Sequence, residues 1–150
     1  MYEELKAQIE FEEGKKLKKY KCTAGHWTIG IGHNLDVKPK MRDWVIPDII
    51  TDKECDAIFT VDVQDTLESL TKAYPNLRAL TPARRDALLN MAFQMGTAGV
   101  MKFKQMLAAL DNRDWQRAKA MALDSAWATQ TPQRAHRVVQ QLMTGEYYKV

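Results

Sequence analysis

Residues 13–33 read EGKKLKKYKCTAGHWTIGIGH, and the fold of the N-terminal part of the chain follows from this stretch. It places Glu13, Cys22 and Thr28 at a fixed spacing, with eight residues between the first two and five between the last two. Gly14 is a helix stop, and the threonine opens an alternating run that is typical of a strand. A helix end is therefore predicted to face a short sheet across a cleft in which three reactive groups converge. This spacing predicts an enzyme.

The glycines of this stretch and its alternation predict a small antiparallel sheet that extends to about Leu35. Trp27, Ile29 and Ile31 fall on one face, which we expect to be buried. The opposite face carries mainly glycine and is nearly bare of side chains. Because a bare face lets a substrate chain approach the backbone, Gly30 is a candidate substrate-binding residue.

Apolar residues at helical spacing predict a short helix before the sheet. Leu5, Ile9 and, less regularly, Phe11 mark its apolar face. Gly14 is expected to end it in a left-handed conformation. Residues 36–50 read as a polar loop.

The remaining segments are predicted to be helical. Thr51 with Glu54 forms a capping box, behind which apolar residues keep helical spacing to about Tyr74. Further helices are predicted from Thr81-Pro82 to Gly96, from about Phe103 to Leu110, from about Asp114 to Leu123, and from Thr131-Pro132 to about Gly145.

The predicted architecture is α+β in a single domain. A sheet-bearing N-terminal lobe covers about residues 1–50, a connecting helix about residues 51–74, and a helical C-terminal lobe about residues 75–150. The cleft is expected between the lobes. A chain of 150 residues is long enough for such a core, since it buries roughly two-thirds of its unfolded surface.

Composition narrows the class of protein. With 45% hydrophobic and 27% charged residues the chain is an ordinary globular protein. No run approaches the about 20 apolar residues of a membrane span, so we expect no stable membrane insertion. Cys22 and Cys55 fall in different predicted elements and are expected to be free thiols. The histidines show no ligand spacing, so neither a metal nor another cofactor is expected.

The basic run KKLKKYK, residues 15–21, admits two interpretations. A nucleic-acid patch is one, and a solvated basic strand edge is the other. We favour the edge and expect no nucleic-acid partner. The net charge of +3 would help the protein approach an anionic polymer but selects none.

Three blocks of the sequence together resemble one known family. They are residues 13–33, NMAFQMGTAGV at 90–100 and WATQTPQRAHRV at 127–138, and they resemble the T-even phage lysozymes, glycoside hydrolase family 24. The family's motif is a glutamate, an aspartate or sometimes a cysteine, and a threonine at the spacing of Glu13, Cys22 and Thr28. The resemblance implies a lysozyme-like fold and hydrolysis of the beta-1,4 link between N-acetylmuramic acid and N-acetylglucosamine in bacterial peptidoglycan.

The resemblance also implies further site residues and a setting. Arg134 would face Glu13, His33 would form a structural ion pair with Asp62, and the cleft wall would include Phe93 and Gln94. The protein would be a monomeric phage endolysin made in the host cytoplasm. A separate holin would open the membrane, so that the enzyme acts on glycan strands in the periplasm or cell wall and lyses the host.

The chemistry of such a site needs an acid and a group that handles the attacking water. Glu13 is the general acid: desolvation at a helix end would favour its protonated form, and a facing arginine would oppose that. Cys22 stands where a second carboxylate is usual. It would hold and polarise a water together with Thr28, act as a nucleophile, or be passive, and we favour the first role.

An unperturbed thiol, with a pKa of about 8.5, is only a few per cent thiolate at pH 7. The nearby charges of Lys18, Lys19 and Lys21 would lower that pKa. Two other functions stay open. One is a lytic transglycosylase, which needs a single acid, and the other is a catalytically silent peptidoglycan-binding tail module.

Overall fold

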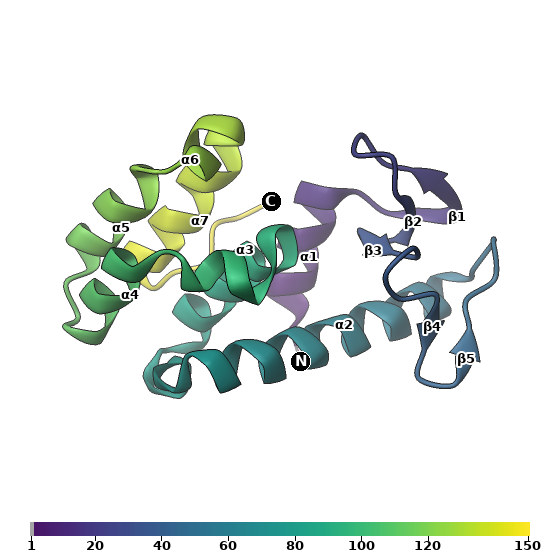
Figure 1. The fold of residues 1–150 in the computed structure, drawn as a ribbon, viewed down its shortest axis with the longest axis horizontal. Coiled ribbons are helices and arrows are strands. Elements are labelled where there is room, and N and C mark those ends of the chain that lie inside the picture. The colour runs from purple at the N-terminus through teal and green to yellow at the C-terminus, as the bar shows by residue number, and fades with distance from the viewer. Residues whose placement is uncertain (1) are drawn as a thin grey trace. The chain divides into compact units, whose positions relative to one another are not determined.

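The structure, a computed structural model, describes residues 2–150, and the chain forms two compact units (Figure 1). We call Met1–Asp65 the sheet unit and Thr66–Val150 the helical unit. Their boundary falls within one continuous helix, α2 (Asp52–Ala73), which contributes residues to both. A small antiparallel sheet followed by a mostly helical remainder confirms the predicted lysozyme-like α+β class.

The sheet unit contains a three-stranded antiparallel sheet in the order β1-β2-β3 and a separate β4–β5 hairpin. The predicted sheet is confirmed. The hairpin lies within residues 36–50, where the sequence predicts a loop. Strands of two residues are too short to show an alternating pattern, so the sequence does not reveal them. The elements before α2 are α1 (Glu3–Glu13), β1 (Lys16–Lys21), β2 (Trp27–Gly30), β3 (His33–Asn34), β4 (Lys40–Met41) and β5 (Trp44–Val45).

Helix α1 turns directly into strand β1 at Gly14. Leu5 and Ile9 are fully buried as predicted, whereas the Phe11 side chain is exposed. Gly14 has a positive φ of 81° but an extended ψ of 173°, so the predicted left-handed helical cap is wrong. Its N–H still donates to the carbonyl of Glu10 at 2.8 Å, which is the last hydrogen bond of the helix. The extended ψ sends the chain straight into β1.

Strand β2 is buried on both faces over most of its length. Ile29 and Ile31 are buried as predicted, but Thr28 on the other face is buried too. Trp27 was expected in the core, and this is wrong, since its side chain is 38% exposed. Trp27 opens the strand beside a turn, where lysines of β1 rather than core side chains meet its ring.

The capping box at the start of α2 is confirmed. The N–H of Thr51 donates to Oε1 of Glu54 at 2.9 Å, and the N–H of Glu54 donates to Oγ1 of Thr51 at 3.1 Å. Two donors at the helix start are thereby satisfied reciprocally. This fixes where the helix begins.

The helical unit continues from α2 through η1 (Pro75–Ala79) and five further helices. Gly96 has φ 77° and ψ 166° and interrupts α3 as predicted, but the helix resumes beyond it. The short helix α6 was not predicted, because five residues are too few for a periodic pattern. The five are α3 (Pro82–Met101), α4 (Lys104–Asp111), α5 (Trp115–Leu123), α6 (Ala126–Gln130) and α7 (Pro132–Thr144).

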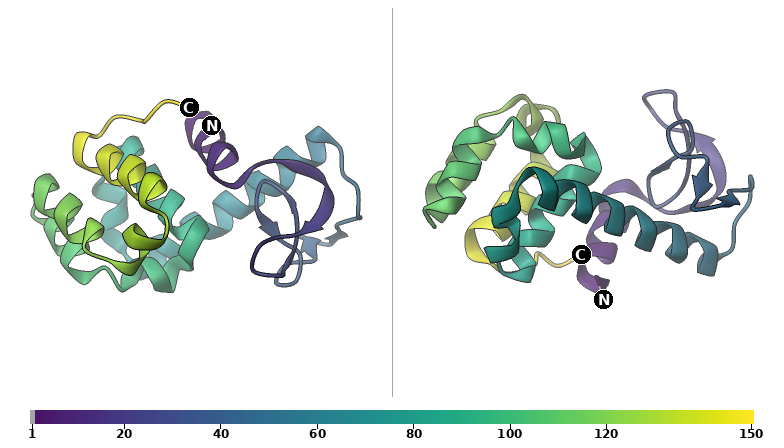
Figure 2. Two further views of the ribbon diagram at one scale, coloured as in Figure 1. Left: turned by 90° about the horizontal axis from the view of Figure 1, so that it is seen from above. Right: turned by 60° about the horizontal axis from the view of Figure 1, so that its bottom comes forward.

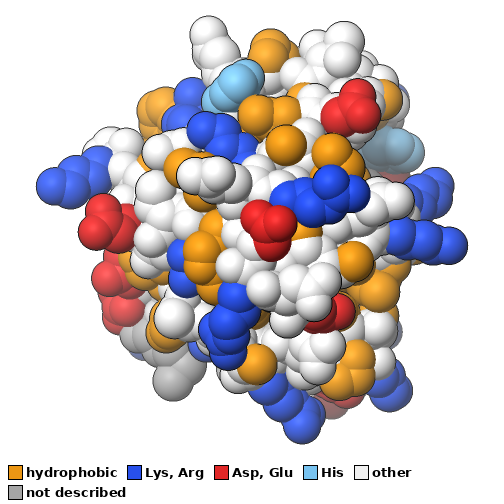
Figure 3. Space-filling view, turned by 90° about the vertical axis from the view of Figure 1, so that its left-hand side faces the viewer, with side chains coloured by type: hydrophobic (Ala, Val, Ile, Leu, Met, Phe, Trp, Pro, Cys, Tyr) orange, Lys and Arg blue, Asp and Glu red, His pale blue; other side chains and the backbone are white. Residues whose placement is uncertain are grey.

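Helices α3 and α7 pack side by side in this unit (Figure 2). Arg84 of α3 donates to the carbonyls of Leu142 and Met143, each at 2.8 Å. These carbonyls lie at the C-terminal end of α7, where helices leave acceptors without intrahelical partners and favour positive charge. On the face in Figure 3, lysine and arginine side chains are dispersed among acidic and hydrophobic ones.

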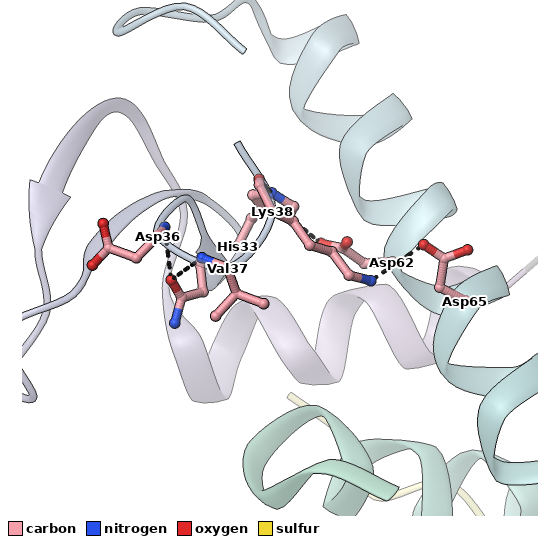
Figure 4. Close-up of polar contacts among 7 residues, drawn as sticks. His33, Asp36, Val37, Lys38, Asp62 and Asp65 are labelled. Carbon is pink, nitrogen blue, oxygen red and sulfur yellow. Dashed lines mark hydrogen bonds and ion pairs between the residues drawn. The ribbon is translucent and has the colours of Figure 1, made fainter. Parts of the chain in front are cut away.

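His33 joins strand β3 to α2 within the sheet unit (Figure 4). Its Nδ1 lies 2.6 Å from Oδ2 of Asp62, and its Nε2 lies 2.7 Å from the carbonyl oxygen of Lys38. The amine of Lys38 in turn lies 3.2 Å from Oδ2 of Asp65. Both ring nitrogens face acceptors, and only the imidazolium has two donors. The buried ring is therefore held in its charged form.

This pair makes the stability of the fold depend on pH. Burial lowers the pKa of His33, but its bonds to Asp62 and to the Lys38 carbonyl raise that pKa more, so the net shift is upward. A raised folded-state pKa means that the stabilisation is complete below the ordinary pKa of about 6.5 and is lost as pH rises through the folded-state value.

We expect Asp62→Asn to lower the free energy of unfolding by about 3 kcal/mol at about pH 5, because it strands a buried charge. The loss should shrink at about pH 9, where the wild-type ring is neutral as well. Urea unfolding at both pH values measures it. Asp65→Asn, which removes the half-exposed carboxylate that pairs with Lys38 and Arg42, is the matched control. An equal loss at both pH values would contradict the charged-ring interpretation.

Candidate active site

Glu13 is the last residue of α1 and packs against Gly32 in the sheet unit. A Cβ at Gly32 would lie 3.1 Å from Cβ and 3.3 Å from Oε2 of Glu13. Gly32 also has a φ of +65°, a conformation that side chains rarely adopt. Any larger residue at position 32 would displace the carboxylate. The glycine thus sets where the half-buried Glu13 side chain lies.

Cys22 occupies the turn between β1 and β2. The N–H of Gly25 donates to its carbonyl at 2.8 Å, and its own N–H donates to the carbonyl of His26 at 3.0 Å. Hydrogen bonds from the backbone of His26, then from Ala24 and the Thr28 hydroxyl, lower the pKa of the Cys22 thiol against the opposing effect of burial. The thiol is free and half-buried, and Cys55 is free as well, as predicted.

The predicted cause of this shift is wrong. We expected lysine charges to lower the pKa of Cys22, but backbone and hydroxyl donors are what stabilise its thiolate. The amines of Lys19 and Lys21 lie instead over the indole of Trp27, at 4.7 and 5.3 Å from its centroid. Lys19 also pairs with Asp48 at 3.1 Å. The pKa of the thiol is thus lowered by the hydrogen-bond donors of the turn, and counting the charged residues nearby in the sequence does not reveal these donors.

Thr28 is buried, and its hydroxyl donates to the carbonyl of His26 at 3.0 Å. The same hydroxyl is a hydrogen-bond partner of the Cys22 sulfur. Because a hydroxyl carries one hydrogen, it donates to the carbonyl or to a thiolate, but not to both. The orientation of the Thr28 hydroxyl is therefore coupled to the charge of Cys22.

Tyr20 lies with Glu13, Cys22 and Thr28 in the structure, but it is not among the site residues predicted from the sequence. It pairs with Thr28 in the register of β1 and β2. Burial raises its pKa, and the negative charges of Glu13 and Cys22 raise it further, so the phenol keeps its proton beside both groups. Alternation places Tyr20 and Cys22 on one face of the chain, and that signal was available.

Gly30, predicted to contact substrate, faces packed side chains. A Cβ there would lie 3.2 Å from Sγ of Cys55 and 3.7 Å from Cδ1 of Ile50. The expectation of a bare sheet face at this residue is therefore wrong. Substrate contact through the Gly30 backbone stays a prediction.

Arg134 lies in the helical unit and is buried there. Its Nε and Nη2 donate to Oδ1 of Asn90 at 3.1 and 2.9 Å. The Asn90 amide donates in turn to the hydroxyl of Tyr148 at 3.1 Å. The guanidinium of Arg134, a residue of α7, is thus held against α3 by the side-chain amide of Asn90. Its approach to Glu13, a residue of the other unit, stays a prediction.

Gln94 lies on α3, and both ends of its amide are engaged. Its Oε1 accepts from Nε1 of Trp127 at 2.8 Å, and its Nε2 donates to Oγ1 of Thr131 at 3.2 Å. Phe93, the preceding residue, is half-buried. These contacts hold Gln94 against the α6–α7 segment. The contribution of Phe93 and Gln94 to substrate binding stays a prediction.

The sheet unit thus gathers a carboxyl group at a helix end, an activated thiol, a buried hydroxyl and a protonated phenol. A carboxyl can supply a proton to a leaving oxygen. A thiolate beside a hydroxyl can hold and polarise a water. Within residues 2–150 no group of histidine, cysteine and acidic side chains is placed to hold a metal ion. None of the helices described is long and apolar enough to cross a membrane.

Comparison with known proteins places the chain among lysozymes. The phage lysozyme family model matches residues 10–144. The probable T4-type lysozyme 1 of Dictyostelium discoideum is 34% identical over 167 residues, covering 97% of this chain and 96% of that protein. The pre-baseplate central spike protein Gp5 of Enterobacteria phage T4 is 39% identical over 153 residues, 89% of this chain and 26% of Gp5. The peptidoglycan hydrolase gp36 of Pseudomonas phage phiKMV is 26% identical over 136 residues, 91% of this chain and 14% of gp36.

The two thiols should differ sharply in reactivity. We expect iodoacetamide to alkylate Cys22 in the native protein with a midpoint below about pH 8.5, because its thiolate is stabilised. Cys55 is 1% exposed and burial raises its pKa, so it should react only after unfolding. Thr28→Val, which removes one donor, should move the Cys22 midpoint upward. Mass spectrometry of labelled peptides against pH measures both, with Cys22→Ser as the blank. A midpoint unchanged by Thr28→Val would contradict the hydroxyl's role.

Proposed function

Because this chain belongs to the phage lysozyme family, we propose that it is a muramidase that hydrolyses the beta-1,4 bond between N-acetylmuramic acid and N-acetylglucosamine in bacterial peptidoglycan. The similarity to a peptidoglycan hydrolase supports the class of substrate. The observation that carries the proposal is one cluster in the sheet unit: the half-buried Glu13 at a helix end, with Cys22 and Thr28 hydrogen-bonded in the adjoining hairpin.

In the proposed reaction Glu13 acts as the general acid. Its carboxyl proton passes to the glycosidic oxygen as the bond from that oxygen to the anomeric carbon breaks. The positive charge that develops at the anomeric carbon is then met by a water oxygen, which forms the new bond. Glu13 is left as a carboxylate and takes a proton back from solvent.

Cys22 and Thr28 would hold the attacking water. The lowered pKa of Cys22 favours a thiolate, which accepts a hydrogen bond from the water and then its proton as the new carbon–oxygen bond forms. The hydroxyl of Thr28 orients the same water. A water held in this way attacks from the side opposite the leaving group, so an inverted anomer is the expected product. A thiolate thereby takes the place of the second carboxylate.

Two other functions remain as alternatives. Without a second carboxylate, a lytic transglycosylase is chemically reasonable, since the sugar's own hydroxyl attacks and Glu13 alone suffices. A catalytically silent wall-binding tail module is the other, and the similarity to part of a phage spike protein favours it. The cluster around Glu13 favours the muramidase over a silent module.

For the biological role we propose a monomeric phage endolysin. It would accumulate in the host cytoplasm, pass a membrane lesion made by a holin, and degrade glycan strands in the periplasm or wall. Expression in a host with and without a holin tests this. Lysis only with the holin supports the role, and lysis without it contradicts the route.

The first test of the reaction is digestion of purified peptidoglycan by the wild type and by Glu13→Gln, with products identified by mass spectrometry. We expect hydrated muropeptides from the wild type and release from the variant that is slower by about 10²–10⁴-fold, since an amide cannot supply the proton. Products one water lighter would establish the transglycosylase instead. Glu12→Gln, one residue away in α1, is the matched control.

The second test addresses Cys22. Alkylation of this thiol should abolish activity because the adduct fills the place of the water, while Cys55→Ser should retain activity with little change. Cys22→Asp should stay active, since a carboxylate accepts the same hydrogen bonds from the backbone. Turbidity loss of a cell-wall suspension measures all three. Full activity after confirmed alkylation of Cys22 would exclude its role with the water.

A further inference from the structure

The basic run of β1 is only partly neutralised. Lys15 pairs with Asp52 at 2.6 Å, and Lys19 pairs with Asp48 at 3.1 Å. Lys18 and Lys21 have no carboxylate partner among residues 2–150. Alternation places Lys19 and Lys21 on one face of the strand and Lys18 on the other. The face with Lys19 and Lys21 also carries an aromatic ring.

That ring is the exposed indole of Trp27. The amines of Lys19 and Lys21 lie 4.7 and 5.3 Å from its centroid, within the range of cation–π contacts. Lys21 is also the residue that pairs with Trp27 in the register of β1 and β2. Two positive charges are thus gathered at one ring. An anion that bound between them would reduce their mutual repulsion.

Both backbone groups of Trp27, its N–H and its carbonyl, are held by hydrogen bonds. Its N–H donates to Oδ2 of Asp36 at 3.1 Å, and its carbonyl accepts from the N–H of Leu35 at 2.8 Å. The same Asp36 oxygen lies 3.3 Å from Nδ1 of His26. The indole is therefore presented from a rigid strand although its side chain is exposed. Fixing such a group before binding reduces the entropy lost when a ligand binds.

We propose that Trp27, Lys19 and Lys21 form a binding surface for the acidic glycan strand of peptidoglycan. The indole takes the apolar face of a sugar ring, and the two amines take carboxylates of the peptides on muramic acid, or of muramic acid units that carry no peptide. This inference rests on the proposed function, because it names a further part of the substrate that the proposed enzyme would bind. Trp27 precedes Thr28 in β2, so the surface belongs to the same hairpin as Cys22.

The number of positive charges at Trp27 favours an acidic glycan over nucleic acid as the ligand. Duplex binders neutralise about 6–10 phosphates with lysine and arginine. Among residues 2–150 two amines converge at Trp27, and one of them is shared with Asp48. Two amines suit isolated carboxylates on a largely neutral sugar chain, and a sugar face suits the indole.

The test measures binding in the Glu13→Gln background, so that no cleavage intervenes. The probes are soluble muropeptides, which carry carboxylates, and neutral N-acetylglucosamine oligosaccharides. Trp27→Ala should weaken binding of both probes about tenfold, whereas Lys19→Gln/Lys21→Gln should weaken only the acidic probe, about fivefold. Lys40→Gln/Lys53→Gln removes two exposed charges of the sheet unit elsewhere and is the matched control. Thermal melts confirm that each variant is folded.

Three outcomes overturn the proposal. They are unchanged affinity for both probes in the Trp27 and lysine variants, equal loss in the control, and tighter binding to a duplex oligonucleotide that depends on the same three residues. Failure of the proposed function looks different. In that case the enzyme with Glu13 intact releases no fragments from peptidoglycan, while binding of the acidic probe still depends on Trp27 and the two lysines.

Discussion

A buried imidazolium connects the parts of the sheet unit that carry the candidate site. His33 lies in β3, its charge is matched by Asp62 of α2, and its second donor is taken by the Lys38 carbonyl in the following loop. The residue before it, Gly32, is the one against which Glu13 packs. The bonds that hold His33 therefore also hold the chain segment against which Glu13, the proposed general acid, packs. Burying such a charge is costly unless both donors are satisfied, and here both are.

The second part of the site depends on the backbone. A hairpin turn directs the N–H groups of His26 and Ala24 at the Cys22 sulfur, and the Thr28 hydroxyl, which donates to the His26 carbonyl, donates to the thiolate when it turns toward it. Hydrogen bonds to the charged form favour it, so the turn stabilises the thiolate of Cys22. A carboxyl group at this position would be ionised at neutral pH without such donors, because its ordinary pKa is about 4. This is how a cysteine can take the water-holding place in a site of this kind. The turn that orients Thr28 also begins the strand that presents Trp27.

Strand β2 serves two purposes because its two faces differ along its length. Beyond Trp27 both faces are covered: Ile29 lies in the core, and Gly30 leaves room for Cys55. At Trp27 the strand emerges beside the lysines of β1. A buried segment gives rigidity, and an exposed residue at its end gives a contact surface. The proposed glycan contact and the proposed chemistry thus share one rigid hairpin.

The sequence by itself determined the α+β class, the beginning of α2 at its capping box, the break at Gly96 and the spacing of Glu13, Cys22 and Thr28. These follow from local rules, since capping, glycine conformation and alternation act over a few residues. Only the tertiary structure decided that Trp27 is exposed, that Gly30 faces Cys55, and that amide groups rather than lysines lower the pKa of Cys22. The physical reason is that burial and hydrogen-bond direction depend on what covers a residue, and the covering groups come from distant segments and from turn geometry that no periodic pattern records.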